Sequence, residues 1–250
     1  MGYSNMLKKF YDRSALGFSI AWIIVYCMLL SAGDAISCAV GIEKSVTFPL
    51  GLLLCGVLFF FLKKYRLLQA YGLCPSAVSA RSMLYYLPVL AMLSANLWYG
   101  TELRFDILET VLYICSMFCV GFLEEIIFRG LLYRAMCVEN PRAAVIVSSL
   151  TFGIGHIINL FNGSGAEPAV TLLQVVYAAA AGFLFVMIFR KTGSLIGCIV
   201  IHGTFNALSV FASEPSGMGE QILSCLLLTV ISGGYAAYLA YSMRKTESQG

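Results

Sequence analysis

Two adjacent carboxylates, Glu124 and Glu125, end an apolar run that is long enough to cross a bilayer. One ionised group at the centre of a membrane helix costs about 2.5–3.5 kcal/mol on insertion scales, so such groups normally face a protein interior or a water-filled cavity. Arg129 lies four residues after Glu125, on the same helical face and in the order that favours an ion pair. Glu124 projects about 100° away around the helix, which leaves it free for chemistry.

The chain has only two histidines, and both lie in other apolar runs. His156 follows Phe152 by four positions, and Asn206 follows His202 by four, so each pair lies on one helical face. A single histidine in a membrane helix is about as often a group satisfied by a neighbouring helix as a functional one. Two histidines and a carboxylate pair in separate membrane helices indicate a functional site.

These residue types are suited to hydrolysis. A carboxylate beside an imidazole can take a proton from water, while the imidazole orients the water or passes the proton on. His202 and Asn206 offer side-chain N–H donors to the oxyanion that forms when water attacks an amide carbonyl. Ser148, Ser149 and the cysteines have no evident base at helical spacing. The cluster therefore indicates peptide hydrolysis without a covalent nucleophile.

The composition excludes an ordinary soluble domain. Of the 250 residues, 60% are hydrophobic and 12% are charged, against about 25% charged in soluble proteins. The formal net charge of +3 is too small and too scattered to indicate a nucleic-acid partner. The 9 cysteines lie mainly in apolar runs and indicate small buried side chains rather than disulfides. Cys115 and Cys119 are one helical turn apart, but no further Cys/His spacing accompanies them to indicate a metal site.

The elements that must position the cluster are apolar helices. A spanning helix needs about 20 mostly apolar residues, and the sequence predicts an all-α, polytopic membrane helix bundle with about eight of them. They form a single integral membrane domain, 1–250. The sequence has no convincing internal repeat, which argues against a transporter whose acids relay protons. The predicted spans are 15–33, 46–62, 82–100, 107–128, 143–162, 169–189, 194–212 and 221–242.

Basic residues set the predicted orientation. With the N-terminus in the cytoplasm, eight spans leave only Lys44 and Arg104 of the 16 Lys and Arg on the outer side, and the C-terminus is also cytoplasmic. The basic segment 63–81 is expected to lie partly along the cytoplasmic surface. The span 107–128 ends near Arg129, which puts the glutamates within about two turns of the boundary. We therefore expect a site in the cytoplasmic half.

Three motifs, in this order, resemble those of the CPBP family: Glu-Glu-x-x-x-Arg at 124–129, Phe-x-x-x-His at 152–156 and His-x-x-x-Asn at 202–206. The extension Phe128-Arg129-Gly130-Leu131-Leu132 is also similar. The family comprises the type II CAAX prenyl endopeptidases and bacterial proteins linked to bacteriocin processing or self-immunity. The resemblance covers about 107–212, and the other predicted spans carry no matching motif.

The resemblance implies an eight-helix intramembrane endopeptidase of the glutamate type. Glu124 would activate water with His156, while His202 and Asn206 would form the oxyanion site. Glu125 and Arg129, with Phe152, would hold the geometry of the site. This version needs no cofactor. The alternative mechanism uses zinc held by Glu124, His156 and His202, since two His and a Glu with water are a known zinc set.

The expected partners are the lipid bilayer and a membrane-associated peptide or protein substrate, without nucleic acid. The eukaryotic side of the family implies a prenylated substrate, and the bacterial side a leader peptide or an anchored precursor. Short loops and small size indicate a bacterial protein of the inner cell membrane. A non-catalytic alternative stays open, in which an immunity factor or scaffold uses the motif residues as a buried polar network that fixes helix packing.

Overall fold

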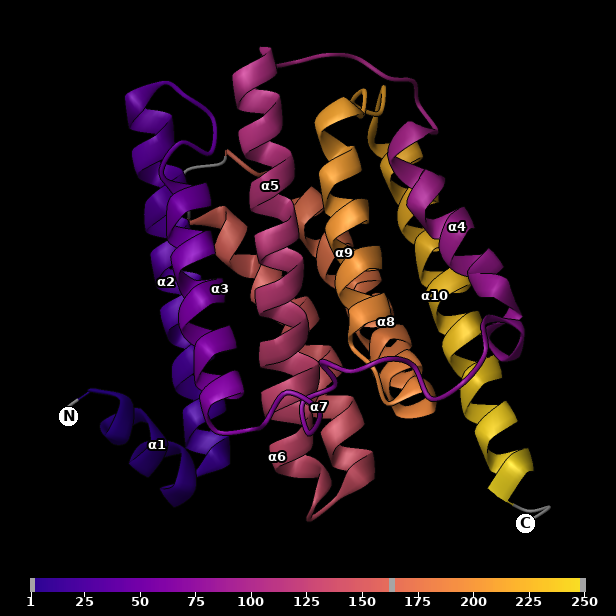
Figure 1. Ribbon diagram of the computed structural model, residues 1–250. Helices are drawn as coiled ribbons and strands as arrows, with labels where there is room; N and C mark the ends of the chain where they lie inside the picture. The colour runs from indigo at the N-terminus through magenta and orange to yellow at the C-terminus, as the bar shows by residue number, and fades with distance from the viewer. Residues whose placement is uncertain (1–2, 162–164, 248–250) are drawn as a thin grey trace.

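The computed structural model describes residues 3–161 and 165–247, and this part of the chain forms a bundle of helices (Figure 1). It contains no β-strand within those ranges apart from one isolated bridge between Thr101 and Ala212. The predicted all-α bundle is confirmed, while residue 162, the end of one predicted span, lies outside the described residues. The elements are α1 (Tyr3–Arg13), α2 (Ala15–Val40), α3 (Thr47–Lys64), η1 (Ala80–Tyr86), α4 (Leu87–Leu93), η2 (Ser94–Leu97), α5 (Ile107–Glu124), η3 (Glu125–Leu132), α6 (Tyr133–Cys137), α7 (Pro141–Gly155), η4 (His156–Leu160), α8 (Pro168–Thr192), α9 (Ile196–Leu208), η5 (Ser209–Phe211) and α10 (Met218–Glu247).

The helices make the chain a polytopic membrane protein. In the described ranges, 6 helices are long and apolar enough to cross a membrane. Each of them overlaps one predicted span, and the two remaining predicted spans, 82–100 and 194–212, have a different form. Together they agree roughly with the predicted count of about eight. The 6 helices are Ala15–Val40, Thr47–Lys64, Ile107–Cys137, Pro141–Leu160, Pro168–Thr192 and Met218–Lys245.

The span predicted at 82–100 is a broken segment made of η1, α4 and η2. Leu84, Tyr85 and Tyr86 have φ values of 49°, 51° and 58°, in the left-handed region that bulky residues seldom adopt. Tyr235 of α10 donates its hydroxyl to the Met83 carbonyl at 2.6 Å. Because α10 supplies this hydrogen bond, the segment keeps its place beside α10 in spite of the break (Figure 1).

The span predicted at 194–212 is short because α9 begins inside the protein. The segment 65–79 crosses the end of the bundle and covers the turn between α8 and α9. The Leu195 N–H donates to the Gly72 carbonyl at 2.8 Å, and the Ser194 hydroxyl donates to the Cys74 carbonyl at 2.6 Å. Gly72 has φ +76°, a conformation that suits glycine. Leu195 is consequently fully buried at the start of α9.

The span predicted at 107–128 continues to Cys137, so its predicted end near Arg129 was wrong. The run α5, η3 and α6 is continuous, and Arg129 is 0% exposed. Charges at 124–129 look like the end of an apolar run, but here buried partners neutralise them. Glu124 therefore lies about 15–20 Å from Cys137 along the helix axis, rather than within two turns of its end.

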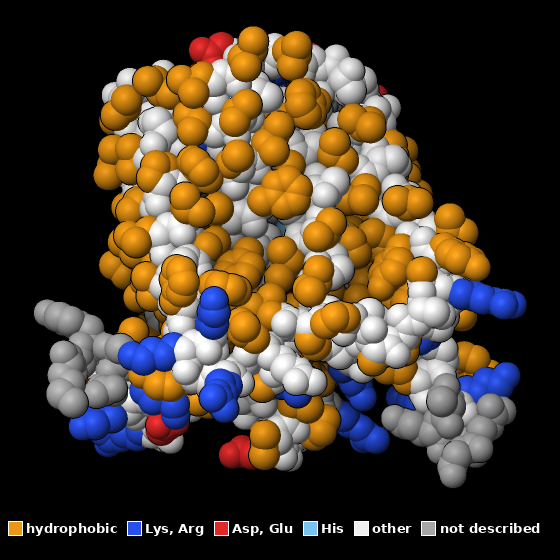
Figure 2. Space-filling view, in the orientation of Figure 1, with side chains coloured by type: hydrophobic (Ala, Val, Ile, Leu, Met, Phe, Trp, Pro, Cys, Tyr) orange, Lys and Arg blue, Asp and Glu red, His pale blue; other side chains and the backbone are white. Residues whose placement is uncertain are grey.

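Both ends of the described chain lie at the same end of the bundle (Figure 1). Figure 2 shows that Lys and Arg side chains gather at this end, while hydrophobic side chains cover most of the face above it. Loops rich in Lys and Arg are typical of the cytoplasmic side of a membrane protein. The predicted cytoplasmic location of both termini stays a prediction, and this charge distribution supports it.

Candidate active site

A glycine contact between α5 and α9 brings the motif residues together. A Cβ atom added to Gly121 would lie 2.8 Å from the backbone nitrogen of Gly203, so the two helices approach closely. Gly121 precedes Glu125 by one helical turn, and Gly203 follows His202 directly. The close approach therefore sets the two glutamates beside His202.

The helix changes its hydrogen-bonding pattern at the site. η3 is a π-helix, a form that is rare and frequently occurs at functional sites. Ser148 of α7 donates its hydroxyl to the Phe128 carbonyl at 2.8 Å, which ties the π-helix to α7. The sequence analysis did not predict this change, because a π-helix gives no separate hydrophobic period in so short a segment.

Glu125 is held by two partners. Its Oε1 accepts a hydrogen bond from Arg129 Nη1 at 3.1 Å, which confirms the predicted ion pair. The same oxygen lies 2.9 Å from His202 Nδ1. Because an ionised carboxylate only accepts hydrogen bonds, this contact assigns a proton to Nδ1. Glu125 and Arg129 are both 0% exposed, so this part of the site is closed to solvent and lipid.

Two phenylalanine rings complete the surroundings of Arg129. Its guanidinium lies 4.0 Å from the ring centroid of Phe152 and 5.3 Å from that of Phe185. The His202 ring stacks on Phe185 at 5.6 Å and meets Phe152 edge-on at 5.6 Å. Within the described residues, Glu125 Oε2 and Arg129 Nε and Nη2 lack hydrogen-bond partners, so cation–π contacts supply part of the stabilisation. Phe185, from α8, was not among the predicted site residues.

Glu124 faces a different set of groups. Tyr26 of α2 donates its hydroxyl to Glu124 Oε1 at 2.5 Å, and Oε2 lies 3.4 Å from His202 Nε2. The second distance exceeds the usual 2.7–3.2 Å of an N–H···O hydrogen bond. Both Oε2 and Nε2 are therefore able to bind a third group. The sequence analysis missed Tyr26, whose partner lies 98 positions away and at no diagnostic spacing.

The other two predicted site residues are held less firmly. His156 begins η4 and is partly exposed, and its ring lies 5.3 Å from the Phe152 ring. Asn206 lies one turn after His202 on α9, and its side-chain amide forms no hydrogen bond to the described residues. Both side chains are thus available to a substrate.

The positions of Glu124, His156 and His202 can be compared with those that zinc ligands require. The 3.4 Å between Glu124 Oε2 and His202 Nε2 is close to the separation of about 3.3 Å expected for two tetrahedral zinc ligands. In the described part of the chain, however, no three His, Cys, Asp or Glu side chains are arranged to hold a metal ion. His156 would have to move toward the other two. As they stand, these donors do not complete a zinc site.

The 6 long apolar helices define an integral membrane protein, and the paired carboxylates and histidine form a polar site enclosed by its helices. Residues 106–208 match the family described as Type II CAAX prenyl endopeptidase Rce1-like. All three motifs lie within this match, so the family resemblance predicted from them is confirmed over this segment. A comparison with curated proteins finds no match to the chain. Tyr26 lies outside the matched segment, although its hydroxyl contacts Glu124.

Proposed function

We propose that the protein is an intramembrane endopeptidase that hydrolyses a peptide bond of a membrane-associated peptide or protein. One observation carries the proposal: Glu124 Oε2 and His202 Nε2, from helices far apart in the sequence, lie 3.4 Å apart in a nearly closed site. Their other polar atoms are occupied by Tyr26 and Glu125. The match of residues 106–208 to an endopeptidase family supports the same conclusion.

Glu124 is the general base in this proposal. Tyr26 occupies Oε1, which leaves Oε2 to take a proton from the water that attacks the substrate carbonyl. His156, at the partly exposed edge of the site, orients this water. The water oxygen bonds to the carbonyl carbon, its proton moves to Glu124, and the carbonyl oxygen becomes an oxyanion.

His202 and Asn206 stabilise that oxyanion. Glu125 fixes the His202 ring through Nδ1, so Nε2 is directed toward Glu124 and the open side of the site. The ring lies between the two carboxylates, with Nδ1 beside Glu125 and Nε2 beside Glu124, and the proposal requires a proton on each ring nitrogen. Nε2–H then donates to the oxyanion together with the Asn206 amide. When the C–N bond breaks, the leaving amine takes the proton from Glu124.

The substrate follows from the location of the site. Because the site lies among apolar spans, the peptide must be anchored in the bilayer or carry a lipid. A prenylated peptide and an anchored precursor, including a bacteriocin leader, are both of this class. We place the protein in the bacterial cell membrane, with both termini in the cytoplasm and with the peptide entering from that side.

The test compares cleavage by the purified protein in lipid nanodiscs. The substrates are a farnesylated fluorogenic peptide and a fluorogenic peptide with a transmembrane anchor. Glu124→Gln should lower turnover by about 10²–10⁴, the usual contribution of a general base. Glu139→Gln is the matched control, because Glu139 is exposed and forms no ion pair with a described residue. Turnover by Glu124→Gln at the wild-type rate would contradict the proposal. Absence of cleavage by every form of the protein, all of them folded, would favour the non-catalytic alternative.

The zinc alternative is tested on the same assay. We expect turnover to persist after treatment with 1,10-phenanthroline and dialysis, with no stoichiometric zinc by elemental analysis. Asn206→Ala should lower kcat by about 10²–10³, the typical cost of losing an oxyanion donor. A residue beside a zinc site would matter far less. One zinc ion per chain, with activity that follows its removal and return, would overturn the metal-free mechanism.

A further inference from the structure

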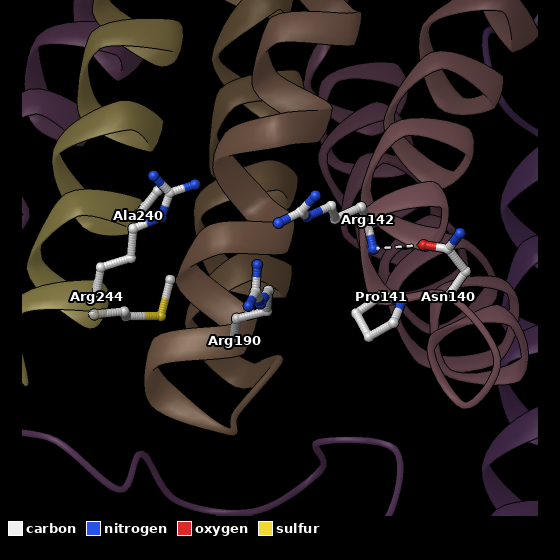
Figure 3. Close-up of a pocket in the computed structure, with 7 residues that line it drawn as sticks. Asn140, Pro141, Arg142, Arg190, Ala240 and Arg244 are labelled. Atoms are coloured by element: carbon white, nitrogen blue, oxygen red, sulfur yellow. Dashed lines mark hydrogen bonds between the residues drawn. The ribbon is translucent and has the colours of Figure 1, made fainter. Parts of the chain in front are cut away.

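A basic hollow lies at the end of the bundle where the Lys and Arg side chains gather. It has a volume of about 420 Å³, within the usual range for small-molecule sites. The hollow opens between α7, α8 and α10 (Figure 3). None of the residues of the candidate active site lines it. Its lining consists of Asn140, Pro141, Arg142, Arg190, Ala240, Met243 and Arg244.

Three arginines from three helices face this hollow. Figure 3 shows the guanidinium groups of Arg142 and Arg190 pointing toward each other, while Arg244 reaches in from α10. In the described part of the chain, no carboxylate lies within 4.0 Å of any of them. All three side chains are exposed, so water and salt screen part of their mutual repulsion, and a bound anion would offset the rest.

Helix-end electrostatics explain only part of this arrangement. Arg190 and Arg244 lie in the last turns of α8 and α10, where a cation is favoured by the helix dipole. That effect does not require the side chains to converge on one space. The Asn140 Oδ1 already accepts the N–H groups of Arg142 and Ala143 at the start of α7. An anion in the hollow would therefore be bound by the guanidinium groups rather than by the helix end.

The chemistry of the lining identifies the class of anion. Guanidinium groups bind phosphate through paired N–H donors, and basic pockets between membrane helices at the cytoplasmic surface bind lipid headgroups. Pro141, Ala240 and Met243 give the hollow an apolar side, and farther along the same helices α7 and α10 expose apolar side chains, among them Ile146, Leu150 and Val230. We propose that this hollow binds the phosphate-bearing headgroup of an anionic membrane lipid, with its acyl chains along the apolar surface.

Native mass spectrometry of the full-length protein in a neutral detergent tests this site. The probes are phosphatidylglycerol, zwitterionic phosphatidylcholine and inorganic phosphate. Each basic residue near an anionic lipid contributes about a fivefold factor in affinity. Arg190→Gln/Arg244→Gln should therefore lower the affinity for the first bound phosphatidylglycerol molecule by about 25-fold. Arg142→Gln alone should lower it by about fivefold. The single variant keeps the test decisive if the double variant fails to fold.

Lys9→Gln/Arg13→Gln is the matched control. Both residues are exposed on α1, which lies at the same end of the bundle but well apart from α10 (Figure 1). This pair should leave phosphatidylglycerol binding within twofold of wild type. Equal binding of the two lipids by wild type, or equal losses in the control and the hollow variants, would overturn the site. Saturation by micromolar inorganic phosphate without lipid would show a soluble ligand and overturn the lipid assignment.

Discussion

Glu124 and Glu125 are neighbours in the sequence, but they face two different regions of the molecule. Glu125 pairs with Arg129, whose guanidinium lies against the rings of Phe152 and Phe185, and both charged side chains are 0% exposed. Glu124 is 8% exposed and has one oxygen beside His202 that no hydrogen bond fills. In the closed region the charged side chains hold one another in a fixed arrangement. In the open region Glu124 Oε2 has no hydrogen bond to a described residue. Only the open region can therefore accept a substrate or a water.

The closed region should dominate stability. Glu125→Gln removes one partner of a buried ion pair, which typically costs about 3–5 kcal/mol because the other charge stays buried. We expect Tm to fall by roughly 6–20 °C in nanodiscs. Glu124→Gln should leave Tm close to wild type while abolishing most turnover. The comparison fails if the two variants lose similar amounts of stability.

The close contact between α5 and α9 should control turnover, because it sets the positions of the glutamates relative to His202. Gly121→Ala puts a Cβ atom 2.8 Å from the Gly203 backbone, so α5 and α9 must separate. A misplacement of about 1 Å can cost roughly 10²-fold in turnover, and we expect a loss of that size. Gly56→Ala is the control, since a Cβ atom there meets nothing within 4 Å. Wild-type kcat in Gly121→Ala would show that the helix contact does not set the site geometry.

Of these substitutions, Tyr26→Phe should have the smallest effect. Its effect should be confined to the open region around Glu124. Tyr26→Phe removes the hydroxyl that holds Glu124 Oε1. We expect about a tenfold loss of kcat, the lower end for a hydrogen bond to a charged group, because Glu124 keeps its contact with His202. The control is Tyr113→Phe, whose hydroxyl bonds to Ser209 at 2.9 Å. An effect of Tyr26→Phe on KM alone would contradict an action through Glu124.

The sequence predicted the bundle and the residue pairs within single helices because these depend on local information. Apolar length marks a spanning helix, and a four-residue spacing predicts the Glu125–Arg129 pair that the structure contains. The same spacing put Phe152 with His156, and their rings are in contact. These features need no knowledge of which helices are neighbours.

Other features depend on tertiary contacts and could not be predicted. Tyr26 contacts Glu124 across 98 positions, and Phe185 reaches Arg129 from another helix. The π-helix is tied to a hydroxyl of α7 through Ser148, so its register depends on packing. The end of the span near Arg129 was misplaced for a related reason. Charged residues mark the end of a membrane helix only where no buried partner neutralises them.

The broken segment at 80–97 also bears on the order in which the chain is assembled during synthesis. Three consecutive left-handed residues interrupt its hydrogen-bond ladder, and unsatisfied backbone groups are costly in lipid. Its partner Tyr235 is translated 152 positions after Met83. The Met83 carbonyl therefore has no access to this partner until α10 has been synthesised. A chain that ends before residue 218 would lack both α10 and this hydrogen bond, so the last helix to be made completes the packing of an earlier segment.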